Sequence, residues 1–150
     1  MIYEKSSKLL AKVKISGGGR CNVTHNCLQT SKLSKNYPRG ERFLKKSFSQ
    51  FSVPDTIQWF ESRGVKLKTE ADNRMFPISD DSQSIIDCLM REVRKSNVTI
   101  STKTPVKKIV PHGGDFTLEF EGHENQRYDR IVICTGGSPK ISGFDWLKQL

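Results

Sequence analysis

The segment Ser16-Gly17-Gly18-Gly19-Arg20-Cys21-Asn22 is the strongest constraint on the fold of this 150-residue chain. Three consecutive glycines disfavour a helix or strand interior, so the segment is predicted to be a loop with unusual backbone dihedrals or a close neighbour. Downstream, the apolar run Ile131-Val132-Ile133-Cys134 predicts a strand buried on both faces, which ends at Thr135-Gly136-Gly137. Glycines also serve ordinary tight turns, but loops without side chains let backbone N–H groups approach phosphate oxygens closely. Two such loops therefore indicate an anionic ligand.

The rest of the chain alternates between helical and strand patterns. Apolar residues recur at helical spacing in three segments, and the second begins with a cap formed by Ser52 and Asp55. Helices are predicted over residues 41–51, 52–64 and 81–95, and strands over residues 2–4, 65–68, 98–100, 106–110, 116–120 and from 127 into 131–134. Helices, an antiparallel meander and a buried strand ending in Gly-Gly predict an α/β fold with a β-meander crossover. Sites in such folds lie at the carboxyl ends of the buried strands.

The net charge of +9 is concentrated in the first third of the chain. Residues 1–50 contain eleven Lys and Arg against two acids, whereas the other hundred residues are balanced. A local positive field attracts polyanions, either nucleic acid or the pyrophosphate of a cofactor, and the alternative is a solvated basic surface. Nucleic acid is the less favoured ligand because the region lacks the interleaved aromatic residues of a stacking platform. Phe43, Phe48 and Phe51 are interpreted as core residues.

Several other classes of protein and site are disfavoured. No segment approaches the roughly 20 apolar residues of a membrane span, and the N-terminus lacks the apolar core of a signal peptide, so the expected location is the cytoplasm. The cysteines and histidines lack the spacing of metal ligands, and reduced thiols are expected, with Cys134 as a small buried residue. These residues are Cys21, Cys27, Cys88, Cys134, His25, His112 and His123.

Specific matches to a known family run in order along nearly the whole chain. They occur over residues 3–24, at Phe43-Leu44, Phe60 and Gly64-Val65, in Arg74-Met75-Phe76-Pro77, and over residues 131–138. With these matches the chain resembles the aminoacetone oxidase-like, bile-acid-reductase-related family of FAD-binding bacterial flavoproteins. The resemblance implies a glutathione-reductase-like fold, in which a Rossmann-type FAD domain carries an inserted helical or mixed segment. Residues 1–40 and 80–150 would then form part of the FAD domain, and residues 41–79 would begin the insertion.

The resemblance also implies which residues bind the cofactor. Glu4 matches the acid that would hydrogen-bond the adenosine ribose, and the backbone of Val106 would lie beside the adenine. The glycine-rich loop and the later Gly-Gly loop would lie near the flavin and pyrophosphate. The loop residues concerned are Ser16, Gly17, Gly18, Gly19, Arg20, Cys21, Asn22, Thr24, Thr135, Gly136 and Gly137. The implied reaction passes hydride through the flavin to a small-molecule substrate, with NADH or NADPH as donor and no catalytic side chain identified here.

One feature of the family has no counterpart in this sequence. The family places a strand and a G-x-G-x-x-G loop roughly thirty residues before the acid at Glu4. Only three residues precede Glu4 here, so we expect a truncated piece of the flavoprotein that is inactive alone. Exposed strand edges in such a piece favour self-association. The alternatives are a basic nucleic-acid-binding module and a non-catalytic folded remnant.

We expect the chain, made on its own, to hold FAD weakly or not at all, because the strongest pyrophosphate contact of the family is missing. The visible absorption spectrum, recorded with and without added FAD and after dialysis, measures this. Stoichiometric flavin that survives dialysis would contradict the prediction.

Overall fold

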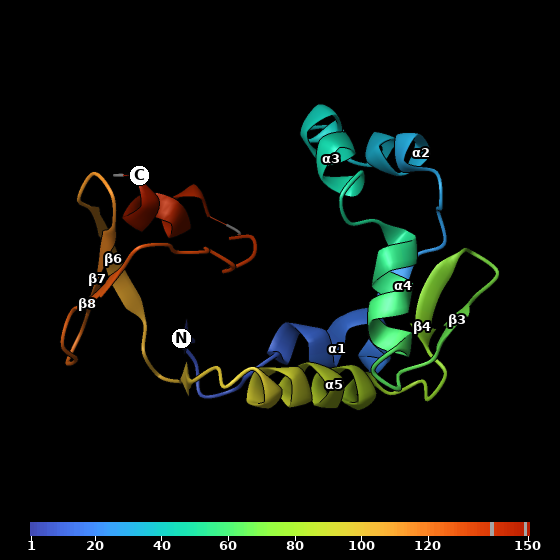
Figure 1. The fold of residues 1–150 in the computed structure, drawn as a ribbon, viewed down its shortest axis with the longest axis horizontal. Helices are drawn as coiled ribbons and strands as arrows, with labels where there is room; N and C mark the ends of the chain where they lie inside the picture. Colours follow the sequence, from blue (N-terminus) through green and yellow to red (C-terminus); the bar gives the residue numbers. More distant parts are fainter. Residues whose placement is uncertain (139, 149) are drawn as a thin grey trace. The chain divides into compact units, whose positions relative to one another are not determined.

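The computed structural model describes residues 1–138, 140–148 and 150. The chain divides into two compact units (Figure 1). Unit 1 contains Met1–Leu9 and Val98–Leu150, and unit 2 contains Leu10–Asn97. These units do not test the predicted domain boundaries near residues 40 and 80, which remain a prediction.

Unit 2 combines helices with a small antiparallel sheet. Its three strands lie in the order β2-β4-β3, and α1 packs against α5, as Figure 1 shows. The helices are α1 (Ala11–Gly19), α2 (Thr30–Lys35), α3 (Glu41–Phe48), α4 (Val53–Glu61) and α5 (Ser82–Lys95). The strands are β2 (Thr24–His25), β3 (Leu67–Thr69) and β4 (Arg74–Pro77).

Local sequence signals account for the starts of α4 and α5. The backbone N–H of Ser52 donates to the Asp55 carboxylate over 2.7 Å, and the Ser52 hydroxyl donates to the same oxygen over 2.8 Å. Both hydrogen bonds hold the pKa of Asp55 below its usual value, and the bond from the Ser52 hydroxyl has the larger effect. At α5, the Asp81 carboxylate accepts from the Gln83 N–H over 2.8 Å. Both helices therefore begin where a carboxylate satisfies a free backbone donor, and the cap of α4 is the one that the sequence predicts.

Unit 1 pairs two short parallel strands and carries the predicted meander. Strand β1 (Ile2–Tyr3) runs parallel to β5 (Ile100–Ser101). The antiparallel strands β6 (Val106–Pro111), β7 (Phe116–Phe120) and β8 (Gln126–Tyr128) follow, and then the 3-10 helix η1 (Ile141–Leu147). The Tyr3 ring packs 4.7 Å from that of Phe120, and its hydroxyl lies 2.6 Å from that of Tyr128. Burial and this hydrogen bond raise the pKa of Tyr3 to about 12.

The predicted buried strand over residues 131–134 is wrong. These residues have no regular secondary structure, Val132 is 86% exposed, and Cys134 is exposed rather than buried. A strand buried on both faces needs paired neighbours and a covering layer. Among the described residues, no strand pairs with this segment, and β8 ends at Tyr128.

The interpretation of the phenylalanines near α3 as core residues is also wrong for two of them. Phe43 is 77% exposed and Phe51 is 54% exposed. Phe48 is partly buried, with its ring 5.8 Å from that of Tyr37. Leu44 and Phe48 lie one helical turn apart on the partly buried face of α3, and Phe43 lies outside that face. The helix also ends earlier than predicted, at Phe48, so Phe51 lies beyond it.

Replacing Phe76 by alanine should lower the free energy of unfolding by about 3–5 kcal/mol, because its side chain is fully buried in β4. Urea denaturation followed by circular dichroism measures the change. Phe43→Ala is the control and should change the same quantity by less than about 0.5 kcal/mol, because that ring is exposed. Equal losses in the two variants would contradict the assignment of Phe76 to the core.

Candidate functional site

The glycine-rich loop has the unusual backbone that its sequence predicts. Helix α1 is interrupted at Ser16 (φ −65°, ψ 148°), and the next two residues, Gly17 and Gly18, have φ of 54° and 70°. Gly19 has φ of 87°, and even Cys21, which is not a glycine, has φ of 63°. Glycine adopts this left-handed region without steric cost, whereas most residues avoid it. The backbone therefore departs from helical geometry at this loop.

Adjacent glycines in the loop are required for different reasons. A Cβ at Gly17 would lie 2.7 Å from Cε1 of Phe76 and 2.8 Å from the backbone nitrogen of Asn22, distances that no real side chain tolerates. A Cβ at Gly18 would have no heavy atom within 4 Å, and one at Gly19 would meet only a carbonyl oxygen at 4.0 Å. Gly17 is thus needed for packing, while Gly18 and Gly19 present open backbone to solvent.

The Arg20 side chain holds the loop in place. Its guanidinium carbon lies 4.0 Å above the centre of the Phe76 ring, a cation–π arrangement. It forms an ion pair with Glu70, and its Nη1 lies 3.6 Å from Asp80 Oδ1. Its Nε donates to the carbonyl of Gly17 over 3.4 Å. The hydrogen bond to Glu70 raises the pKa of Arg20, so its positive charge is already compensated within the protein.

The two ends of the loop are fixed to neighbouring elements. On the α1 side, the Ser82 hydroxyl of α5 donates to the Lys14 carbonyl over 2.9 Å. After the loop, the Val23 N–H donates to the carbonyl of Met75 in β4 over 2.9 Å. Cys21 is buried in a cluster of apolar side chains, which contains Cys21, Val65, Ile85 and Cys88. Its thiol therefore belongs to the core, and any ligand contact at Cys21 would come from the backbone.

The last loop residues run beside β4. Thr24 is paired with Met75 in the antiparallel ladder between β2 and β4. With its nitrogen turned toward the strand, the exposed Asn22 amide donates to the carbonyls of Thr24 and Met75 over 2.9 and 3.3 Å. Asn22 and Thr24 thus lie at the β2 edge of the three-stranded sheet of unit 2.

Sequence reasoning missed the acidic partners of Arg20. Of the two adjacent acids that precede α5, Asp80 and Asp81, only Asp81 caps the helix. Asp80 instead pairs with Lys68 and with Arg20. Both contacts lower the pKa of Asp80, and the hydrogen bond from Lys68 has the larger effect. Glu70 is fifty residues from Arg20 in the chain, so no local pattern could have indicated the pair.

The remaining predicted cofactor residues belong to unit 1, where two of them lie close together. The backbone N–H of Glu4 donates to the Ser101 carbonyl over 2.9 Å, and the backbone carbonyl of Glu4 accepts from the Thr104 N–H over 3.0 Å. Val106 begins β6 two residues after Thr104. The Glu4 carboxylate accepts from the Ser6 N–H over 2.8 Å. The carboxylate predicted to bind ribose and the backbone predicted to lie by adenine therefore share one corner of unit 1.

The later glycine loop lies in an exposed segment of unit 1 without regular secondary structure. Thr135, Gly136 and Gly137 are all exposed, and Gly136 has φ of 70°. A Cβ at Gly137 would meet nothing within 4 Å. In the described part of the chain, no helix is long and apolar enough to cross a membrane, and no three His, Cys, Asp or Glu side chains converge as metal ligands.

A shallow hollow in unit 2 has no counterpart among the predicted sites. It has a volume of about 290 Å³. The lining residues are Gly64, Val65, Lys66, Pro77, Ile78, Ser79 and Ser84. It brings together no pair of acid and base, and none of the predicted cofactor residues lines it.

Comparison with known proteins agrees with the mixed α/β architecture. The chain matches the model of the HI0933-like protein Rossmann domain over residues 1–142. It is a Rossmann-type α/β protein with a parallel strand pair. The chain belongs to the HI0933-like family.

Curated relatives carry names of two kinds. A 3-dehydro-bile acid delta(4,6)-reductase of Clostridium scindens is 28% identical over 143 residues, which are 94% of this chain and 33% of that protein. A ribosomal RNA dihydrouridine synthase of Escherichia coli is 28% identical over 137 residues, which are 91% of this chain and 33% of that protein. The chain thus spans about a third of the length of these relatives.

The resemblance to bile-acid-reductase-related proteins is confirmed at the level of the family. The aminoacetone oxidase likeness and the glutathione-reductase-like details remain predictions.

Replacing Asp80 by asparagine should lower the melting temperature at neutral pH and should make it less sensitive to acid. The folded-state pKa of Asp80 lies below its ordinary 3.8, so its stabilising contribution is complete above that value and is lost as the pH falls through the lowered pKa. Asparagine also tolerates the positive φ of 52° at this position. Melting curves from about pH 6 down to about pH 3 measure the difference between the two proteins, which should narrow on acidification. A difference that is constant over this range would contradict the ionic role of Asp80.

Proposed function

We propose that this chain forms part of the FAD-binding region of a flavin-dependent oxidoreductase. Its family membership supports this proposal. The names of two relatives, a reductase and a dihydrouridine synthase, have in common the addition of hydrogen to an organic substrate. The proposed reaction class is therefore reduction.

The observation that carries the proposal is the open glycine backbone at Gly18 and Gly19. Both residues have positive φ, and neither would bring a Cβ within close contact of the protein. Packing alone therefore does not require the absence of side chains at these two positions. A large anionic cofactor that lies against the backbone does require it, because a side chain would hold the cofactor away from the N–H groups. The loop fits a flavin nucleotide on this ground.

The residues of this chain would bind and position the cofactor. Gly18 and Gly19 would lie against it, and Arg20 would keep their backbone in shape through Phe76 and Glu70 rather than bind phosphate itself. In its reduced form, the bound FAD would supply a hydride to the substrate, with NADH or NADPH as the proposed donor.

Unit 1 would contribute the remaining cofactor contacts. Glu4 would accept a hydrogen bond from the ribose, and the Val106 backbone would lie beside the adenine. Thr135, Gly136 and Gly137 would approach the cofactor through their backbone. We further propose that residues 41–79 begin an inserted segment in the complete enzyme.

Gly18→Val, introduced into the intact protein that contains residues 1–150, should reduce the purified flavin content at least tenfold, by roughly 1.4 kcal/mol or more of binding energy. The valine side chain would occupy the open face where the cofactor is proposed to lie. Flavin is measured by its absorbance after release by heat. Gly122→Val is the matched control, because Gly122 has φ of 71° against 70° for Gly18 and also has no neighbour within 4 Å. It imposes the same backbone strain in a hairpin turn.

Equal flavin content in both variants and the wild type would reject the loop as the binding element. A wild-type protein without any flavin, even after purification with added FAD, would favour a non-catalytic folded remnant.

A further inference from the structure

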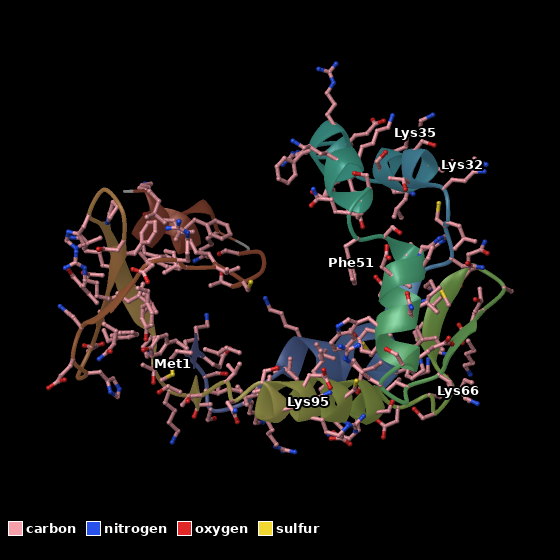
Figure 2. All side chains as sticks on the ribbon, viewed as in Figure 1. Met1, Lys32, Lys35, Phe51, Lys66 and Lys95 are labelled. Atoms are coloured by element: carbon pink, nitrogen blue, oxygen red, sulfur yellow. The ribbon has the colours of Figure 1, made fainter. Side chains whose placement is uncertain are left out.

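A pair of tyrosine hydroxyls connects β1 to the meander of unit 1. The hydroxyl oxygens of Tyr3, in β1, and Tyr128, in β8, lie 2.6 Å apart in a partly buried environment. The Tyr3 ring also packs against Phe120 of β7, with ring centres 4.7 Å apart, and meets the Tyr128 ring edge-on at 6.3 Å. Met1, labelled in Figure 2, is exposed and immediately precedes β1. One side chain of β1 thus contacts two strands of the meander.

The two residues predicted to contact adenosine belong to different sheets. Glu4 directly follows β1 of the two-stranded sheet, whereas Val106 begins β6 of the three-stranded meander. In the described part of the chain, no backbone ladder joins these two sheets. The position of Glu4 relative to Val106 therefore depends on side-chain contacts and on the connecting residues 102–105.

The connecting residues are held by hydrogen bonds that do not extend into β6. Thr104 is 4% exposed, and its Oγ1 donates to the Thr102 carbonyl over 3.0 Å and lies 2.7 Å from Oγ of Ser101. The backbone N–H of Thr104 donates to the Glu4 carbonyl. These bonds fix Glu4 to β5 and to the connecting residues. The Tyr3 side chain supplies the further link, from β1 to the meander.

Tyr3 packs on the face of the meander that carries Val106. Val106 and Phe120 are register partners in the ladder between β6 and β7, so their side chains are neighbours on one face. Tyr128 is the register partner of Phe116, which precedes Phe120 by four residues on the same strand and therefore shares that face. Both residues that Tyr3 contacts thus lie on the same face as the residue predicted to lie by adenine.

We propose that Tyr3 and Tyr128 are positioning residues for the adenosine end of the cofactor, a role that rests on the flavin function proposed above. Their hydrogen bond fixes Glu4 relative to Val106, so that the ribose and the adenine of one adenosine reach both residues. The phenols act through Glu4 and do not contact the cofactor. A site whose contacts are held in place before binding loses less free energy in ordering them.

The hydroxyl pair is present over the whole neutral pH range. Burial and then the hydrogen bond to Tyr128 raise the pKa of Tyr3 to about 12. The Tyr3 phenol therefore keeps its proton at neutral pH, and the pair always has a donor. A pair that is continuously formed suits a permanent support of a binding site rather than a switch.

The test measures the dissociation constant of FAD by quenching of its fluorescence, with the intact protein that contains residues 1–150 after its flavin has been removed. Tyr3→Phe and Tyr128→Phe each remove one hydroxyl and keep the ring. Each should weaken FAD binding roughly fivefold, the loss that one ordinary hydrogen bond gives. The double variant should bind as either single variant does, because both hydroxyls serve the same bond.

Tyr37→Phe is the matched control. It removes the hydroxyl of the third tyrosine of the chain, which has an exposed ring in unit 2. FAD should bind this variant as it binds the wild type. Melting temperatures of the same samples show that every binding constant is measured on folded protein.

A double-mutant cycle with Glu4→Ala separates positioning from fold stability. In the Glu4→Ala protein, adding Tyr128→Phe should weaken FAD binding by less than about twofold, because the contact that the hydroxyl pair positions is already lost. A hydroxyl pair that only stabilised the fold would lower FAD affinity by the same factor in both backgrounds.

Three results would overturn the positioning role. In the first, Tyr3→Phe and Tyr128→Phe bind FAD as tightly as Tyr37→Phe does. In the second, Tyr128→Phe has its full effect in the Glu4→Ala protein. In the third, Glu4→Ala binds FAD as the wild type does. All three leave the glycine-rich loop as a flavin site, whereas a wild-type protein that binds no FAD would reject the flavin proposal together with this one.

Discussion

The contact between Phe76 and the backbone at Gly17 determines the shape of the glycine-rich loop. The fully buried ring leaves no space for a side chain at residue 17, and its face supports the guanidinium of Arg20. Glu70 and Asp80 then fix the other side of that guanidinium. The loop is thus held by the buried ring of Phe76, by the close packing at Gly17 and by the paired guanidinium of Arg20. The next two positions, Gly18 and Gly19, have no close neighbours. The closely packed residue Gly17 and the open residue Gly18 are therefore adjacent in sequence.

The cations of the chain fall into two groups, those with an acidic partner and those without one among the described residues. Arg20, Lys68 and Arg74 pair with acids in or near the small sheet, so their charge contributes to the fold. The exposed cations over residues 30–51 have no carboxylate within 4.0 Å in the described structure, so their mutual repulsion has to be tolerated by the folded state. They are Lys32, Lys35, Arg39, Arg42, Lys45 and Lys46. Net charge alone does not distinguish the two groups of cations, because the distinction depends on which acids lie close to which cations in space.

Features that depend on neighbouring residues were predicted correctly from the sequence. The capping pair at Ser52, the meander of β6, β7 and β8, and the positive φ values at the three glycines all follow from local rules. Features that depend on distant partners were not. The apolar run at residues 131–134 has the composition of a buried strand, but composition does not supply the paired neighbours that a strand needs. Likewise, Phe43 was interpreted as a core residue, and its sequence neighbours do not reveal that its face of α3 is uncovered.

The glycines of the loop differ in what requires them. At Gly17 any side chain collides with Phe76 and Asn22, so folding alone requires glycine at this position. At Gly18 folding asks only for a residue that accepts positive φ, a demand that asparagine or aspartate also meets. Glycine at residue 17 therefore answers to the fold alone, whereas glycine at residue 18 also answers to the cofactor that we propose for the open face of the loop.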